Sequence, residues 1–207
     1  NEFICNFGRE KETMSLCSGI IVFLLLSAIA ESASYDSAYK DPNFSYVRSG
    51  CGVTLYPQVC YKTTSRYAGL IRRNPARLAK VAMAISLSHT RNVSFYLAQR
   101  STERYAASAL SDCRSNLEDA VDQIAGSIKQ MRMLKTTGYD DEIGFQMSNV
   151  QTWMSSALTD QETCTDGLQE FGGGSLKADV VGRVEAIKRL TSNALALFNS
   201  YASGRRN

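Results

Sequence analysis

The fold is decided by residues 110–134, which read LSDCRSNLEDAVDQIAGSIKQMRML. Apolar side chains recur there at steps of three or four residues, which is the period of one face of an α-helix. The positions of this stripe are Leu110, Cys113, Leu117, Val121, Ile124, Ile128, Met131 and Leu134. Gly138 follows the stripe, as is typical of a helix end. The stretch therefore predicts a long helix that buries one face against other elements.

Three further helices are predicted around this one. Pro75 suits the first turn of a helix, and the acidic run 140–142 favours the start of another. A flexible glycine-rich link at 172–175 precedes the last helix, and a polar turn containing Cys164 is expected before that link. The predicted stripes are Leu78, Val81, Ile85, Asn92 and Tyr96; Ile143, Met147, Val150, Met154 and Ala157; and Val180, Val184, Ile187, Ala194, Phe198 and Tyr201. Four helices with short links predict an all-α, antiparallel four-helix bundle.

The N-terminal part of the chain is typical of a targeting segment. Residues 20–30 form an apolar run of eleven residues, about half the length that crosses a bilayer. The run ends in small residues and follows Met14, an arrangement that favours a secretory signal peptide. We therefore predict a leader and signal peptide at 1–30 and a flexible tail at 31–43. A signal anchor or a buried helix is the alternative.

Four cysteines remain after removal of the predicted leader, at Cys51, Cys60, Cys113 and Cys164. In an exported chain four cysteines suggest two disulfides, with three possible connectivities. The sequence also carries two N-glycosylation sequons. They begin at Asn43 and Asn92 and fit the secretory route.

The residues that enzymes need for catalysis are not recognisable in this sequence. Its one histidine, His89, lies in a predicted helix with no acid beside it in sequence. The acidic run 140–142 is better explained by helix capping than by a metal site, so we expect no metal and no cofactor. The net charge of +3 does not favour nucleic-acid binding. A lipid or small-ligand cavity between the helices is an alternative to plain core packing.

Several motifs resemble the plant invertase and pectin methylesterase inhibitor family. Residues 51–60, CGVTLYPQVC, are similar to the cysteine hairpin that opens this domain. Further similar motifs are ALSDC at 109–113, TWMSSALT at 152–159, TCTDG at 163–167 and SNALAL at 192–197. The resemblance places the domain at 44–203. It implies the disulfides Cys51–Cys60 and Cys113–Cys164 and a short disulfide-linked helical hairpin before the bundle.

The resemblance also implies a function without catalysis. Family members are secreted to the plant cell wall, where they block a pectin methylesterase or an acid invertase by docking helices over the enzyme's cleft. The matching partner-binding positions are Asp119, Asp122, Thr163 and Asp166, although a solvated helix face would explain each of them as well. Invertase inhibitors often carry Pro-Lys-Phe before the last helix, which residues 174–179 lack. We therefore expect a pectin methylesterase inhibitor. Invertase inhibition and a pro-region of a pectin methylesterase are the alternatives.

Overall fold

The computed structural model describes residues 41–100, 107–134, 140–169 and 174–206. Within them the chain is helical. The elements, in order, are α2 (Pro42–Cys51), α3 (Pro57–Thr64), the 3₁₀ turn η1 (Ser65–Tyr67), α4 (Ala68–Ile71), α5 (Pro75–Arg100), α6 (Ala107–Met133), α7 (Asp140–Gly167) and α8 (Gly174–Arg206). The predicted leader at 1–30 and the tail up to residue 40 lie outside the described residues. The last residues of that predicted tail, Pro42 and Asn43, form the start of α2 instead.

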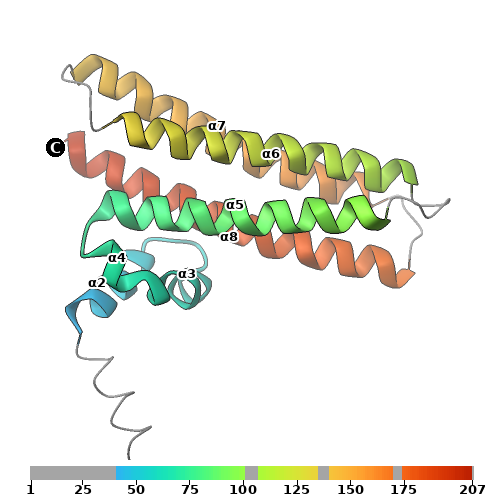
Figure 1. Cartoon of the computed structure of the whole chain (residues 1–207), viewed down its shortest axis with the longest axis horizontal. Coiled ribbons are helices and arrows are strands. Elements are labelled where there is room, and N and C mark those ends of the chain that lie inside the picture. The colour runs from blue at the N-terminus through green and yellow to red at the C-terminus, as the bar shows by residue number, and fades with distance from the viewer. Residues whose placement is uncertain (1–40, 101–106, 135–139, 170–173, 207) are drawn as a thin grey trace, which may run out of the picture. The chain divides into compact units, whose positions relative to one another are not determined.

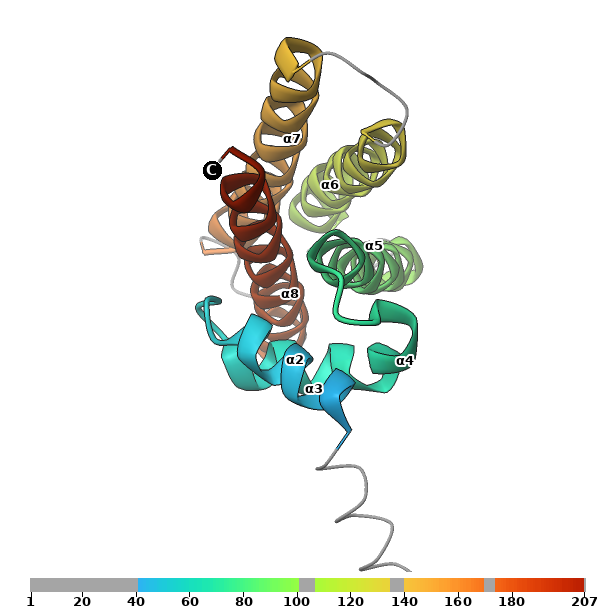
Figure 2. The same ribbon diagram turned by 90° about the vertical axis from the view of Figure 1, so that its left-hand side faces the viewer.

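The four long helices form the predicted antiparallel bundle. Successive helices run in opposite directions, and each packs against the next, with α8 closing the ring against α5 (Figure 1). The short helices α2, α3 and α4, hereafter the arm, lie across α5 and α8 on the side of the bundle away from α6 and α7 (Figure 2). The all-α fold class and the preceding helical hairpin are therefore confirmed. None of the described helices is long and apolar enough to span a membrane.

Helix α6 buries the stripe that the sequence predicts. Six of its eight positions are at most 3% exposed, and Val121 and Ile128 are half-buried. Gly138, expected to end this helix, lies outside the described residues.

Helix α5 starts as expected but buries a different face. The Asn74 side chain accepts a hydrogen bond from the backbone N–H of Arg77 at 2.9 Å, which caps the helix before Pro75. The predicted stripe is wrong beyond Leu78, because Asn92 is exposed and Val81, Ile85 and Tyr96 are only half-buried. The buried positions are Leu78, Ala79, Ala82, Met83, Ser86, Thr90, Val93, Ser94 and Leu97. Small and hydroxyl-bearing residues form this face because α8 and α6 both pack against it, and apolar periodicity does not detect them.

The predicted polar turn around Cys164 is also wrong, because α7 continues to Gly167. Its buried face runs on through Gln161, Cys164 and Leu168, which are each at most 1% exposed. The Thr163 hydroxyl donates a hydrogen bond to the carbonyl of Thr159 at 2.9 Å, so this polar side chain is accommodated within the helix. Polarity alone therefore did not mark a helix end here.

The expected glycine-rich link is shorter than predicted, because α8 begins at Gly174. Gly174 has φ +53°, a left-handed conformation that glycine adopts without steric cost. Ser175 is already helical, while residues 172 and 173 lie outside the described part of the chain.

The buried side chains form two apolar clusters along the bundle. The arm-side core joins the arm to the adjoining halves of the long helices, and includes Cys51, Met83, Ile124, Met154 and Phe198. The distal core fills the other half and consists of Val93, Leu97, Leu110, Cys113, Leu117, Cys164, Leu168, Val180, Val184 and Ile187. Each cluster draws on all four long helices, so both ends of the bundle have their own packed interior.

A polar layer separates the two cores, formed by Ser86, Thr90, Gln161 and Thr191, which are all 0% exposed. The hydroxyls of Ser86 and Thr191 are hydrogen-bonded at 2.7 Å, which links α5 to α8. The Gln161 side-chain N–H donates to the Thr90 hydroxyl at 3.3 Å, which links α7 to α5. Buried polar groups are tolerated when they are paired, and these pairs fix how the helices align along their axes.

The turn between α2 and α3 is held by a disulfide within the arm and by hydrogen bonds to α8. A disulfide joins Cys51 to Cys60 across the turn between α2 and α3. Asn193 of α8 accepts a hydrogen bond from the Tyr56 backbone N–H at 3.1 Å and donates one to the Tyr56 carbonyl at 2.9 Å. One amide side chain therefore satisfies both backbone groups of Tyr56 and holds the turn against α8.

Candidate partner-binding surface

The predicted partner-binding residues lie on α6 and α7, whose mutual position is fixed covalently. A disulfide joins Cys113 of α6 to Cys164 of α7. Farther along the same pair, the Trp153 ring lies so close to Gly126 that an added Cβ would meet it at 3.4 Å. These two contacts hold the outer faces of α6 and α7 in one register, which is what a rigid binding surface requires.

Asp119 lies opposite a carboxylate that the sequence did not single out. Asp160 of α7 is half-buried, and its burial raises the pKa of its carboxyl above the ordinary value. A hydrogen bond from Gln123 lowers this pKa, and the negative charge of Asp119 raises it again. The Asp160 Oδ2 atom is buried without a hydrogen-bond partner among the described residues. The pair therefore places negative charge where α6 packs on α7, and the exposed carboxylate of Asp119 can accept a hydrogen bond from a cationic donor of a partner.

A weak signal for Asp160 is present in the sequence. Asp160 precedes Thr163 by three residues, and positions three apart lie on the same side of a helix. The sequence did not show that Asp119 lies opposite Asp160, because the two are brought together only by the packing of α6 on α7.

Thr163 and Asp166 are both exposed on α7. They are three residues apart, so they share one side of the helix. The Thr163 hydroxyl donates to a carbonyl of its own helix, which leaves its oxygen lone pairs available as acceptors. Both residues can therefore contact a partner that covers α7.

Asp122 lies on the other flank of α6. It lines a hollow together with Arg91 and Phe95 of α5, on the side away from Asp160. The structure thus places all four predicted residues on the exposed outside of α6 and α7. The four residues do not meet at one point, because Asp119 lies on the side of α6 that faces α7 and Asp122 lies on the side that faces α5.

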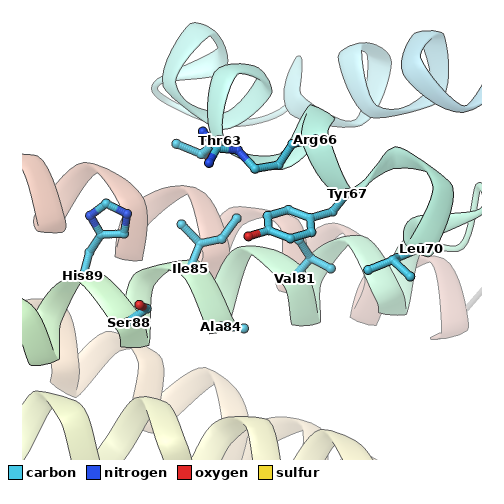
Figure 3. Close-up of a pocket in the computed structure, with 9 residues that line it drawn as sticks. All are labelled: Thr63, Arg66, Tyr67, Leu70, Val81, Ala84, Ile85, Ser88 and His89. Atoms are coloured by element: carbon cyan, nitrogen blue, oxygen red, sulfur yellow. The ribbon is translucent and has the colours of Figure 1, made fainter.

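A separate groove of about 320 Å³ lies between the arm and α5 (Figure 3). Arg66, Tyr67 and Leu70 line it from the arm, while Ile85 and His89 line it from α5. No carboxylate lies among its lining residues. His89 therefore lies in a groove without an acid to orient it, an arrangement unlike that of a general base.

The acidic side chains do not gather into a cluster in the described part of the chain. This part contains no group of three or more histidine, cysteine, aspartate or glutamate side chains close enough to hold a metal ion. Glu142, from the acidic run at the start of α7, accepts a hydrogen bond from the Gln146 side chain at 3.1 Å. Of the two sequon asparagines, Asn92 is exposed on α5 and Asn43 is half-buried in α2.

Comparison with known proteins gives consistent matches. The family model described as plant invertase/pectin methylesterase inhibitor matches residues 45–197. The chain is 36% identical over 197 residues to the "21 kDa protein" of Daucus carota, a match that covers 92% of this chain and 98% of the carrot protein. It is 35% identical over 199 residues to "Pectinesterase inhibitor 9" of Arabidopsis thaliana, with coverages of 93% and 98%.

Two solved structures share the fold at low identity. A crystal structure of a mutant form of a pectin methylesterase inhibitor from Arabidopsis aligns with a TM-score of 0.58 at 20% identity, over 72% of this chain and 92% of that one. A second pectin methylesterase inhibitor, from Arabidopsis thaliana, aligns with a TM-score of 0.51 at 19% identity, over 75% and 95%. At these identities the structures support the architecture alone.

Proposed function

This chain belongs to the plant invertase/pectin methylesterase inhibitor family, and we propose that it binds and inhibits a pectin methylesterase. The observation that carries this proposal is the full-length similarity to a protein named as a pectinesterase inhibitor. The chain supplies no reacting group in this function. Its role is to cover the enzyme's cleft with a preformed helical surface.

The charge of the surface supports the same target. Demethylation converts neutral methyl esters of pectin into carboxylates, so cationic groups around an esterase's cleft would suit the partly demethylated polymer. Asp119, Asp160 and Asp166 present carboxylates on α6 and α7, and complementary charge favours correct encounter and register between proteins. Acid invertase, which acts on a neutral sugar, gives no comparable reason for an acidic inhibitor surface.

The rigidity of the surface supports inhibition by docking. The Cys113–Cys164 disulfide and the contact between Trp153 and Gly126 hold α6 and α7 together before any partner arrives. A preorganised surface loses less conformational entropy on binding than a flexible one. Binding therefore does not require the helices to rearrange.

We further propose that the protein is secreted to the cell wall. The apolar run at 20–30 and the sequons at Asn43 and Asn92 support an export route. Two disulfides in a chain of this size are typical of an oxidising compartment. N-terminal sequencing of the exported protein should find a start after Ala30 or within 32–34, and retention of residues 14–30 would contradict the signal peptide.

The test of the inhibitory function is a pair of titrations. The oxidised protein is added to a plant pectin methylesterase and, separately, to an acid invertase, and the remaining activity of each enzyme is measured. We expect loss of esterase activity alone. Inhibition of the invertase alone would support the alternative, and two fully active enzymes would refute an inhibitory role.

A charge reversal locates the surface. Asp119→Lys should weaken inhibition of the esterase roughly thirtyfold or more, because loss of one partner of a buried charge pair costs about 2–5 kcal/mol. Glu185→Lys is the matched control, since it makes the same charge change on α8, where Glu185 pairs with neighbouring Lys188 at 2.9 Å. Equal inhibition by the two variants would mean that the enzyme contacts another face.

A further inference from the structure

A hollow between α5 and α6 adjoins the partner-binding surface. Its volume is about 460 Å³, and it is lined by Arg91, Ser94 and Phe95 of α5 and by Glu118 and Asp122 of α6. The Phe95 side chain is 67% exposed. A large aromatic ring is therefore exposed to solvent at the side of a hollow that is lined by two carboxylates and one guanidinium.

Packing of the bundle does not explain Phe95. The residue belongs to neither the arm-side core nor the distal core, whereas Ser94 beside it is buried at 8% exposure. Single exposed apolar residues are common on protein surfaces. An exposed aromatic ring bordered by charged side chains is, in addition, the usual composition of a binding hot spot, in which an apolar anchor is enclosed by a polar rim.

Helix α6 connects this hollow to the surface already described. Asp119 faces Asp160 of α7, and Asp122, three residues later, faces the hollow beside Phe95. A protein that contacts both carboxylates must therefore lie across α6 and reach α5. The two flanks of α6 then form one continuous surface.

We propose that the enzyme-binding surface extends across α6 onto α5, with Phe95 as its apolar anchor in a pocket of the esterase that has cationic groups at its rim. This inference rests on the proposed inhibition of a pectin methylesterase. It adds a side chain from the first long helix to a surface that the sequence assigned to the second and third.

The charges of the hollow argue for a cationic rim on the partner. Asp122 makes no ion pair within the described part of the chain. The Glu118 carboxylate lies 3.5 Å from the Arg114 Nε atom in an exposed ion pair within α6. Such a pair contributes little to stability, so Glu118 can exchange it for an ion pair with a partner. The two carboxylates outnumber the one guanidinium that lines the same hollow, that of Arg91, so both are available to basic side chains that surround an inserted Phe95.

The test compares two apolar side chains of nearly the same exposure. Phe95→Ala and Leu70→Ala are titrated against pectin methylesterase, since Leu70 is 66% exposed and lies in the arm, on the side away from α6 and α7. Phe95→Ala should inhibit roughly thirtyfold less well, because hot-spot truncations reach this size, while Leu70→Ala should inhibit as the unmodified protein does. Thermal unfolding of both variants checks that the bundle is intact.

Each other outcome has a definite meaning. If the unmodified protein inhibits and Phe95→Ala inhibits equally, the extension onto α5 is wrong while the inhibitory function stands. Equal losses in the two variants would assign the effect to exposed apolar area in general and would also overturn the proposal. A dimer that dissociates in Phe95→Ala, with inhibition unchanged, would assign the hollow to a second copy of the chain. An unmodified protein that leaves the esterase active refutes the proposed function itself.

Discussion

The two ends of the bundle are closed in different ways. At the arm-side core, three short helices cover α5 and α8 and add buried side chains such as Val47, Ala68 and Ile71. Among the described residues no comparable layer covers the distal core, and a disulfide between Cys113 and Cys164 lies within it. The arm-side core also holds a disulfide, Cys51–Cys60, which closes a short loop within the arm. One end therefore combines additional burial with a short covalent loop, whereas the other has a covalent link between two long helices. The polar layer of Ser86, Thr90, Gln161 and Thr191 marks the boundary between them.

The largest effect should come from placing a charge in the arm-side core. Ile124 is 0% exposed, so Ile124→Asp buries an unpaired carboxylate and removes apolar contacts at once. We expect a loss of more than about 4 kcal/mol, enough to unfold a domain of ordinary stability. Circular dichroism with urea titration measures it. Ile124→Val, expected to cost about 0.5–1.5 kcal/mol, is the control, and a folded Ile124→Asp protein would contradict the burial assigned here.

Removing each disulfide tests the contribution of covalent closure at the two ends. Replacing Cys113 and Cys164 with alanine opens a loop with a sequence separation of 51 and should cost about 4 kcal/mol by loop entropy. Replacing Cys51 and Cys60 opens a separation of 9 and should cost about 2.5 kcal/mol by the same relation. Denaturant midpoints of the two double variants give the order. A larger loss from the arm pair would mean that the distal core does not depend on its covalent link.

The attachment of the arm can be weakened without touching either disulfide. Asn193→Ala removes both hydrogen bonds to Tyr56. The Tyr56 carbonyl keeps its hydrogen bond from the Cys60 N–H, but the Tyr56 N–H loses its acceptor, at a cost of about 1–3 kcal/mol. Limited proteolysis should then cleave the turn between α2 and α3 faster. Asn199→Ala, which removes a single side-chain hydrogen bond to Gln151, is the control. Equal cleavage of the two variants would show that apolar packing alone holds the arm.

The smallest effects should be seen in acid, where two carboxylates respond with opposite sign. The pKa of Asp179, at the distal end, is lowered by its hydrogen bond to Arg183 and next by that from Tyr96. Its contribution to stability is present above the unfolded pKa and is lost as the pH falls through the lowered folded pKa. Because Asp179 is exposed, the effect should be slight.

Asp160 should behave in the reverse way. Burial raises its folded pKa above the unfolded value of 3.8, so the folded state binds its proton more tightly and stability falls as the pH rises through that window. Above that window Asp160→Asn should therefore make the protein more stable relative to the unmodified protein, and Asp179→Asn should make it less stable. Urea unfolding at pH 3 and pH 6 separates them. The same direction of change in both variants would contradict the assigned environments.

The sequence determined the architecture because helix burial is periodic. The stripe from Leu110 to Leu134 predicts α6 and its buried face, and the structure confirms it. Pro75 and the acidic run at 140 correctly mark two helix starts. The motifs around the cysteines identified the family, which the similarity over residues 45–197 confirms. These signals are local, and short stretches of chain suffice to carry them.

Tertiary structure decided which polar residues are buried and which carboxylates meet. Ser86, Thr90 and Gln161 are polar, yet they lie in the interior, where the Ser86 hydroxyl pairs with Thr191 and the Gln161 side-chain N–H donates to Thr90. The same packing sets Asp119 against Asp160, residues that are 41 positions apart (160 − 119), and places Phe95 beside Asp122. Periodicity reports how one helix is oriented, but these pairings depend on how two helices align. Only the packed bundle contains that information.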